Sequence, residues 1–530
     1  MRFRFESSRW TSLGAALAAA AFVGLSSVPA YAQSEILDEL LEKLKDKGVL
    51  SEDEYQALKK AREEERIEQR AERRRQALKQ AQDTEKDEKA KEESKTTLKG
   101  RFNNGFVLES GDKKNSIGIN GRVQADYRQF SPQSISADTF DVRRAYITLS
   151  GKVWEDWTFD VTADLAQGTN GGTFTQVLDV AWVNWGRWKE FQIRAGQFKM
   201  PFSIEELSSS RFLDFTERSY VNQLVPAKER GLMVHGTPYT GLYYGLALSN
   251  GQGKNNNDTN TLASGKDVIG RAVVNIAELA GVQSNAVYHV GAAHSRGNIP
   301  ATAAQSGRTE ARGVTFFAPT TFGAFDSNIE RTRTGFEGSA AYGPVKLQGE
   351  WIKVNYAGSP TATTSFDKDI TAYYAEAMWL VTGENYAGAY RGGTYGRIVP
   401  KRNFDPSSGG WGAWELGLRY SRWDASDFPI QTCGAALPQP TNQGIIQPVC
   451  SGATPLTVGT NSAKAYTIGL KWIPTPNTRV YLNYIQTKFD TPIVIRGGNN
   501  PGTIAATAGT GAPETASSEK AINLRFGIDF

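Results

Sequence analysis

Residues Ser517 to Phe530 read Ser-Ser-Glu-Lys-Ala-Ile-Asn-Leu-Arg-Phe-Gly-Ile-Asp-Phe. From Ile522 onward, apolar side chains alternate with polar or small ones. Successive side chains of a β-strand point to opposite faces of the sheet, so one face of this strand suits hydrocarbon and the other suits water. The chain also stops on an aromatic residue. The pattern is typical of the closing strand of a transmembrane β-barrel, and the alternative is an amphipathic strand of a soluble sandwich.

The composition agrees with a large β protein. The chain of 530 residues contains 53 Gly, 25 Phe, 20 Tyr and 12 Trp. Its mean hydropathy of −0.43 is too polar for a helical membrane protein. The net charge of +4 indicates no bulk affinity for nucleic acid.

Residues 1–32 have the pattern of a secretory signal peptide. Three arginines precede an Ala-rich apolar stretch from Leu13 to Val28, and Ala30-Tyr31-Ala32 is a small-x-small cleavage site. No other apolar run approaches the roughly 20 residues of a transmembrane helix. We therefore expect an exported protein that enters a membrane only as strands.

Residues 33–97 predict helices. A short leucine stripe at helical spacing precedes Gly48, which can end a first helix. Ser51 and Glu54 form a capping box for a second helix, which is almost entirely charged beyond Arg62. We expect a periplasmic coiled coil, and the alternative is an isolated or partly disordered charged helix.

From residue 98 to 530 the sequence alternates with a period of two in runs of nine to fourteen residues. Charged residues lie in mid-strand on one face only, which favours a hydrated lumen over a packed core. We predict sixteen strands, beginning near residues 116, 138, 156, 176, 190, 230, 241, 266, 284, 330, 344, 368, 411, 463, 477 and 517.

The predicted connections alternate between short turns and long loops, as in outer-membrane barrels. The exception is the stretch 384–410, which is long although it falls on the short side. The predicted fold is therefore all-β: a sixteen-stranded antiparallel transmembrane β-barrel with an N-terminal α-helical coiled-coil segment. Tryptophans near the strand ends suit the two interfacial girdles; they are Trp157, Trp185, Trp188, Trp379, Trp411, Trp423 and Trp472.

Two cysteines, Cys433 and Cys450, lie in one long loop and could form a disulfide in an oxidising compartment. No CxxC motif or Cys/His cluster indicates a metal site, and no residue pattern indicates a cofactor or an enzyme.

Four stretches together resemble the phosphate-selective porin O and P family of Gram-negative outer membranes. They are Ile119–Tyr127, Val142–Ile147, Gly196–Ser203 with the following Glu205–Ser209, and Trp379–Glu384. The resemblance covers roughly residues 100–530. It implies a sixteen-stranded trimeric porin with inward-folded loops at the constriction and passive uptake of anions, above all phosphate or polyphosphate. The helical segment departs from the shortest members of the family.

The third long loop, Lys199 to Arg230, is the candidate constriction. Its basic residues are Lys199, Arg211, Arg218, Lys228 and Arg230, and an equal number of acidic residues balances them. Wall arginines that share the lumen-facing parity would have to contribute; they are Arg122, Arg144, Arg271 and Arg333. Arginine suits phosphate because its planar fork gives bidentate, charge-assisted bonds. The alternative is that each arginine pairs with a lumen carboxylate such as Asp126, Asp160, Glu337 or Glu350.

These features predict a channel for passive diffusion of inorganic phosphate or other small anions, embedded in outer-membrane lipid. The first alternative is a general or other-solute porin. The second is an outer-membrane anchor that contacts peptidoglycan through residues 34–95. A homotrimer is expected, and nucleic acid is not an expected partner.

Overall fold

The computed structural model describes residues 39, 41–102, 104–133, 135–168, 177–258, 265–299, 306–317, 329–361, 364–428, 430, 432–433, 456–457, 459–494 and 515–530. Contacts divide the chain into two compact units, Met1–Lys95 and Thr96–Phe530. The predicted signal peptide and Cys450, and with Cys450 the predicted disulfide, lie outside the described residues.

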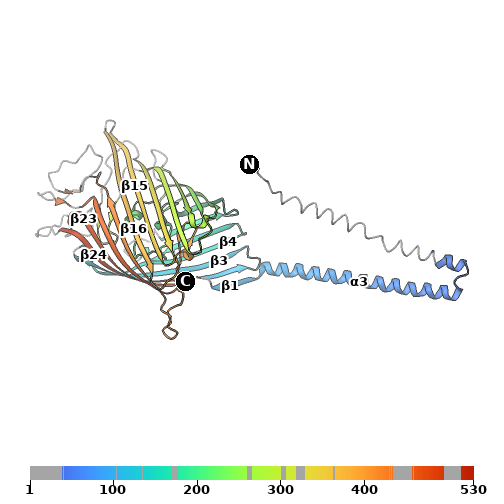
Figure 1. The fold of residues 1–530 in the computed structure, drawn as a ribbon. Coiled ribbons are helices and arrows are strands. Elements are labelled where there is room, and N and C mark those ends of the chain that lie inside the picture. Colours follow the sequence, from blue (N-terminus) through green and yellow to red (C-terminus); the bar gives the residue numbers. More distant parts are fainter. Residues whose placement is uncertain are drawn as a thin grey trace, which may run out of the picture. The chain divides into compact units, whose positions relative to one another are not determined.

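Sixteen antiparallel strands of the second unit form a closed barrel (Figure 1). Each strand pairs with the next along the chain, and the last strand pairs with the first, with Leu524 opposite Tyr127. The strands are β3 (Ser116–Ser131), β4 (Thr139–Val153), β5 (Trp157–Asp164), β6 (Leu178–Trp185), β7 (Gln192–Lys199), β8 (Lys228–Tyr239), β9 (Leu242–Ser249), β10 (Asp267–Asn275), β11 (Ala286–Ile299), β14 (Ile329–Tyr342), β15 (Val345–Thr361), β16 (Thr364–Leu380), β19 (Ala413–Asp424), β22 (Ser462–Thr475), β23 (Thr478–Val494) and β24 (Thr515–Asp529). The predicted sixteen-stranded barrel is confirmed, and each observed strand begins within a few residues of its predicted start.

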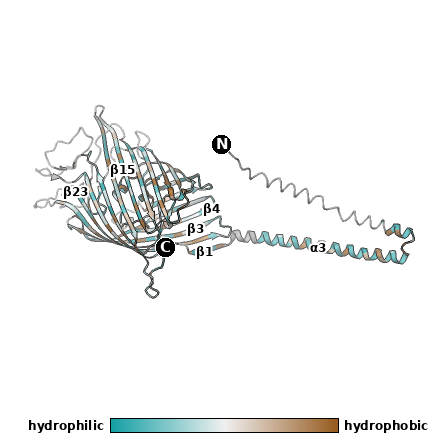
Figure 2. Ribbon diagram, viewed as in Figure 1, coloured by the Kyte–Doolittle hydropathy of each residue, from teal (hydrophilic) through white to brown (hydrophobic). Residues whose placement is uncertain are grey.

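Side chains alternate between a polar lumen and an apolar outer wall. In β24, Asn523 and Arg525 are buried, while Phe526 and Ile528 are more than half exposed on the outer face. Figure 2 shows the same alternation of hydrophobic and hydrophilic residues along other strands. An outer face of this kind removes apolar side chains from water only when hydrocarbon surrounds it.

A short hairpin, which was not predicted as a separate element, precedes the first barrel strand. Strand β1 (Leu98–Phe102) pairs with β2 (Phe106–Ser110), and β2 pairs with the first residues of β3. The remaining short strands form three two-stranded hairpins: β12 (Gly307–Arg308) with β13 (Thr315–Phe317), β17 (Tyr390–Arg391) with β18 (Thr394–Tyr395), and β20 (Thr432–Cys433) with β21 (Leu456–Thr457).

The first unit contains a helical turn at residues 41–46 and the long helix α3 (Glu52–Thr96). Gly48 separates the two with a φ of +73°. The predicted capping box is confirmed: Ser51 N–H donates to the Glu54 carboxylate at 3.0 Å, and Glu54 N–H donates to Ser51 Oγ at 3.3 Å. Within the described residues, no helix is both long enough and apolar enough to cross a membrane. The apolar residues Leu58, Ile67 and Leu78 are exposed, so the coiled coil stays a prediction.

Part of the lumen is filled by a cluster of aromatic rings. Trp423 is completely buried, and its ring centroid lies 6.0 Å from that of Phe316 and 5.9 Å from that of Phe317. Assigning Trp423 to an interfacial girdle was therefore wrong. Trp423 shares the parity of Arg419 and Ser421, both buried, and this parity directs its side chain into the lumen.

The first part of the long stretch on the short-turn side, residues 384–398, also folds into the lumen, whereas residues 401–409 are exposed. It contains the turn η4 (Ala387–Ala389) and the hairpin of β17 and β18. The Tyr395 hydroxyl lies 2.8 Å from Ser339 Oγ, and the Tyr390 hydroxyl lies 2.8 Å from His289 Nδ1.

Candidate pore constriction

The loop between β7 and β8, residues 200–227, crosses the barrel interior, and we call it the inner loop. Its Thr216 N–H donates to Asn483 Oδ1 of β23 at 2.7 Å, and the Lys471 ammonium of β22 donates to its Leu213 carbonyl at 3.1 Å. Strand β22 lies eight strands from β8 in either direction around the ring, so these contacts reach the opposite wall. The loop therefore narrows the lumen, as predicted from its length.

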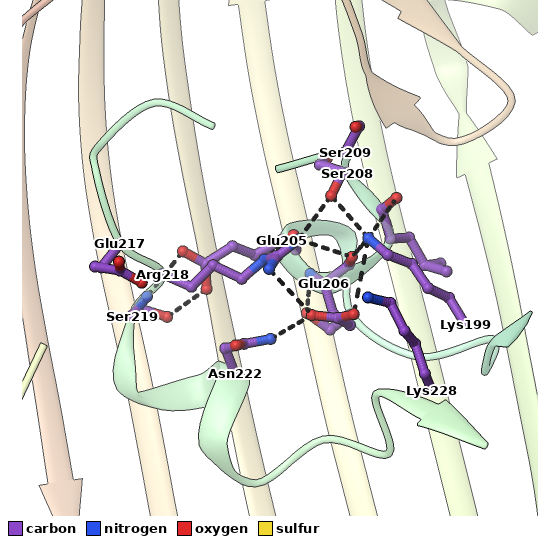
Figure 3. Close-up of polar contacts among 12 residues, drawn as sticks. Lys199, Glu205, Glu206, Ser208, Ser209, Glu217, Arg218, Ser219, Asn222 and Lys228 are labelled. Carbon is purple, nitrogen blue, oxygen red and sulfur yellow. Dashed lines mark hydrogen bonds and ion pairs between the residues drawn. The ribbon is translucent and has the colours of Figure 1, made fainter. Parts of the chain in front are cut away.

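A short helix, α4 (Ile204–Leu207), begins the inner loop and is held by ionic contacts (Figure 3). Lys199 donates to the Glu206 carbonyl and to the Ser208 carbonyl at 3.0 Å. Arg218 donates from Nε to the Glu205 carbonyl at 3.0 Å and from its NH2 group to the Ser208 carbonyl at 2.8 Å. Cations suit these carbonyls because the end of a helix carries partial negative charge.

The Glu206 carboxylate completes this network. Asn222 donates to it at 2.6 Å, and Arg218 and Lys199 approach it at 3.5 and 3.7 Å. Burial opposes ionisation, but Arg218, Lys199 and Lys228 together lower the pKa of Glu206 to about 2. Two of the predicted constriction cations, Lys199 and Arg218, therefore hold the loop in place.

The inner loop is anchored to the second and last barrel strands, β4 and β24, by Glu217. Its carboxylate pairs with Arg143 at 2.6 Å and with Arg525 at 3.0 Å. Arg525 also pairs with Asp126 at 2.6 Å. All of these groups are buried or nearly so, and their charges are mutually compensated.

A β-bulge in β4 brings two adjacent arginines into the lumen. Gln124 of β3 lies opposite Arg144, while the next residue, Ala125, lies opposite Val142, so Arg143 is the extra residue. A bulge lets consecutive side chains share one face. Arg144 donates to Gln124 Oε1 at 2.9 Å, and Arg143 holds Glu217. Strict alternation predicted Arg144 but excluded Arg143.

Along eight consecutive strands, β3 to β10, the lumen remains open. A cavity of about 620 Å³ lies between these strands and the inner loop, and we call it the basic chamber. Among the described residues, six cationic side chains line it against two carboxylates, those of Asp160 and Asp179. The six cations are Arg122, Arg194, Lys199, Arg211, Lys228 and Arg271.

Three arginines of the basic chamber make no ion pair with any described residue. The Arg122 guanidinium lies 3.9 Å from the centre of the Tyr146 ring, and that of Arg194 lies 4.3 Å from the Trp182 ring. Both have a buried Nε without a hydrogen-bond partner. Arg211 donates to Asn120 Oδ1 at 2.7 Å. Burial and the neighbouring Arg122 lower the pKa of Arg211 to about 10, so this residue remains charged at neutral pH.

The other cations of the chamber have partners. Lys228 pairs with Asp179 at 2.6 Å, and Arg271 pairs with Glu337 at 2.5 Å. The sequence left open the alternative that each arginine pairs with a lumen carboxylate. Arg271 forms such a pair, but Arg122 does not. The chamber has an excess of positive charge because the half of the ring that lines it contributes few carboxylates among the described residues.

A second chamber of about 410 Å³ adjoins the first at Lys228. It is lined by Arg218, Lys254, Arg331 and Arg333 and by residues 251–253 of a long loop. Arg331 and Arg333 share one carboxylate, that of Asp267, at 2.9 and 2.8 Å. Gly236 and Gly392 line the basic chamber towards the short-turn side, so the two chambers follow one another along the lumen.

Among the predicted site residues, Arg144 and Arg230 lie outside both chambers. Arg230 donates to Asn257 Oδ1 at 2.5 Å in a neighbouring loop. Sequence reasoning missed Arg194, although Ile193 and Ala195 alternate with it and give it lumen-facing parity. Among the described residues, no group of His, Cys, Asp and Glu side chains could hold a metal ion.

The chain matches the model of a known protein family and is similar to a known porin. The family model "Phosphate-selective porin O and P" matches residues 117–492. Porin O of Pseudomonas aeruginosa is 25% identical over 414 residues, which cover 73% of this chain and 86% of that protein.

Solved structures of outer-membrane proteins also match. OmpT of Vibrio cholerae has a TM-score of 0.43 at 10% identity and covers 79% of this chain and 98% of its own. The outer-membrane channel DcaP of Acinetobacter baumannii has a TM-score of 0.44 at 9% identity, covering 78% and 97%. Because its family model spans most of the barrel, this chain belongs to the phosphate-selective porin O and P family and is a porin channel of the outer membrane.

Proposed function

We propose that this porin conducts small anions by passive diffusion and that phosphate or polyphosphate is its main solute. The observation that carries the proposal is the presence of three arginines, Arg122, Arg194 and Arg211, without ion-pair partners among the described residues of the basic chamber. An uncompensated charge inside a protein is costly unless a counter-ion reaches it. A mobile anion is the natural counter-ion in a hydrated lumen.

The chemistry of these residues suits phosphate. A guanidinium group remains charged and offers paired donors that match two phosphate oxygens. Stacking on Tyr146 and Trp182 holds two of the groups in place and leaves their edges free to donate. A preformed site of this kind loses little side-chain entropy when an anion binds.

The paired cations would complete a path between the two chambers. Lys228 lines both chambers, and Arg331 and Arg333 line the second one. Conduction requires sites that attract an anion but release it, and a series of moderately compensated cations meets that requirement. Their partial pairing with Asp179 and Asp267 limits how tightly any one of them retains an anion.

We further propose a homotrimer, as the family resemblance implies, with residues 33–97 in the periplasm. The exposed apolar residues of α3 could be covered by two further copies of the same helix. Peptidoglycan contact through residues 34–95 remains part of this proposal. Crosslinking of the purified protein in detergent, with and without residues 34–95, tests the trimer and its dependence on the helix.

Block of chloride current by phosphate in a planar bilayer tests the main proposal. Added phosphate should reduce chloride conductance in a saturable manner, because phosphate occupies the chamber for longer than chloride. Sulfate, a tetrahedral dianion, provides a matched control for charge. Undiminished chloride current at high phosphate would contradict phosphate binding and would favour a general porin.

A further inference from the structure

One wall of the basic chamber is apolar and aromatic, although the chamber has excess positive charge. Trp182 and Val180 of β6, Phe198 of β7 and Met233 of β8 line it from neighbouring strands. We call these four residues the apolar strip. A channel for inorganic phosphate alone has no need of such a strip, because every face of that ion is polar.

The strip lies beside an unpaired charge. The Arg194 guanidinium is 4.3 Å from the Trp182 ring centre and 5.9 Å from that of Phe198. Trp182 is only partly buried and packs against the buried hydrophobic cluster of the lumen, which keeps its ring in place. Charge and apolar surface therefore lie within the reach of one small molecule.

The size of the chamber supports a larger occupant. Its volume of about 620 Å³ falls within the range of small-molecule binding pockets, roughly 300–1,000 Å³, and far exceeds one phosphate ion. Such pockets combine apolar walls with a few placed polar groups, as this chamber does.

Resting on the proposed anion channel, we propose that the basic chamber prefers organic anions that combine a phosphate-like head with a compact apolar or aromatic body. The head would bind the guanidinium groups of Arg122, Arg194 and Arg211. The body would lie on the apolar strip and exclude water from it. Inorganic phosphate would contact only the guanidinium groups and not the apolar strip.

The test compares two phosphate monoesters as blockers of chloride current through the full-length channel in planar bilayers. Methyl phosphate and phenyl phosphate are both dianions well above the second phosphate pKa of about 6, so only the body differs. The half-blocking concentration of phenyl phosphate should be roughly five- to tenfold lower, as expected for one added aromatic contact. Equal half-blocking concentrations would overturn the proposal.

Two variants locate the preference. Trp182→Ala should bring the ratio of the two half-blocking concentrations to about one, because it removes the aromatic contact. Block by both compounds should also weaken, because Trp182 holds the Arg194 guanidinium in place. The matched control is Trp185→Ala. Trp185 lies on the same strand, three residues after Trp182, so its ring is on the other face of the sheet. This variant should keep the wild-type preference for phenyl phosphate. A preference that survives Trp182→Ala would overturn the role of the strip.

The wild-type comparison stands even if Trp182→Ala fails to fold. A salt-gradient measurement on the same membranes separates the two proposals. A cation-selective channel would contradict the anion function itself. An anion-selective channel that phosphate blocks, but that shows no preference for phenyl phosphate, would contradict only the preference for an apolar body.

Discussion

The two halves of the lumen use the same residue type for opposite purposes. Along β3 to β10, Arg122 and Arg194 stack on aromatic rings and have no carboxylate partner among the described residues. In the other half, Arg419 pairs with Glu310 at 2.7 Å and with Glu205 at 3.3 Å. A charge that is fully paired holds the inner loop, whereas an unpaired charge remains available to a solute.

The comparison shows that strand parity does not separate structural from functional arginines. Arg271 and Arg419 both point inward from mid-strand, but each has a carboxylate within hydrogen-bonding distance. What distinguishes Arg122 is that it forms no ion pair with any carboxylate of the described residues, although Asp179 lines the same chamber. The following predictions test this distinction.

The largest effect is expected in the paired network. Arg525→Ala leaves Asp126 buried without its main partner and removes one of the partners of Glu217, which should destabilise the fold by roughly 3–5 kcal/mol. Heat-modifiable migration in gels should shift to a markedly lower temperature. Arg187→Ala, which removes an exposed ion pair to Asp156, is the control and should leave that temperature unchanged. A wild-type melting profile for Arg525→Ala would show that the pairing is not structural.

The second effect belongs to the basic chamber. The double variant Arg122→Ala/Arg194→Ala should fold normally and raise the half-blocking concentration of phosphate by at least about a hundredfold, because two charge-assisted hydrogen bonds are lost and each contributes roughly 1.5–3 kcal/mol. The half-blocking concentration is measured by titrating phosphate against chloride conductance in planar bilayers. Unchanged block would mean that anions do not bind these groups.

A smaller contrast separates two residues that the sequence treated alike. Arg211→Ala should weaken phosphate block several-fold, because Arg211 faces the basic chamber. Arg230→Ala should have no measurable effect, because Arg230 contacts Asn257 outside the chambers. The same titration applies to both variants. Equal losses would indicate that long-range charge, and not position in the chamber, governs affinity.

The smallest effect is expected from pH. The pKa of Glu206 is lowered to about 2 in the folded protein, compared with about 4.5 in the unfolded chain. The ionised carboxylate therefore contributes fully to the stability of the fold above pH 4.5, and this contribution is lost as the pH falls through about 2. Current noise and anion selectivity in chloride should therefore be the same at pH 7 and at pH 5. Glu206→Gln should produce at neutral pH the unsteady current expected of the wild type in strong acid. A transition between pH 7 and pH 5 would contradict this anchoring role.

Much of the fold could be predicted because the membrane imposes a period of two on every strand. Ile522, Phe526 and Ile528 face outward as their spacing requires. The helix cap of Ser51 and Glu54 is equally local and was also predicted. In contrast, the bulge at Arg143 was not predicted, because it depends on the register between β3 and β4.

The site was predicted less fully because pairing is a property of three dimensions. Nothing local distinguishes Lys199, which holds the α4 carbonyls, from Arg211, which faces the chamber. The burial of Trp423 depends on residues 306–317, which fold in from a distant loop. Arg194 is different, since its alternation with Ile193 and Ala195 was visible in the sequence and was overlooked.

The most direct test of an anion path lined by unpaired arginines is the reversal potential of the wild-type channel across a potassium chloride gradient. With excess positive charge in the narrow part of the lumen, the reversal potential should have the sign of chloride permeation. The ratio of chloride to potassium permeability should be lower in Arg122→Ala/Arg194→Ala than in the wild type. A reversal potential with the sign of potassium permeation would contradict the account.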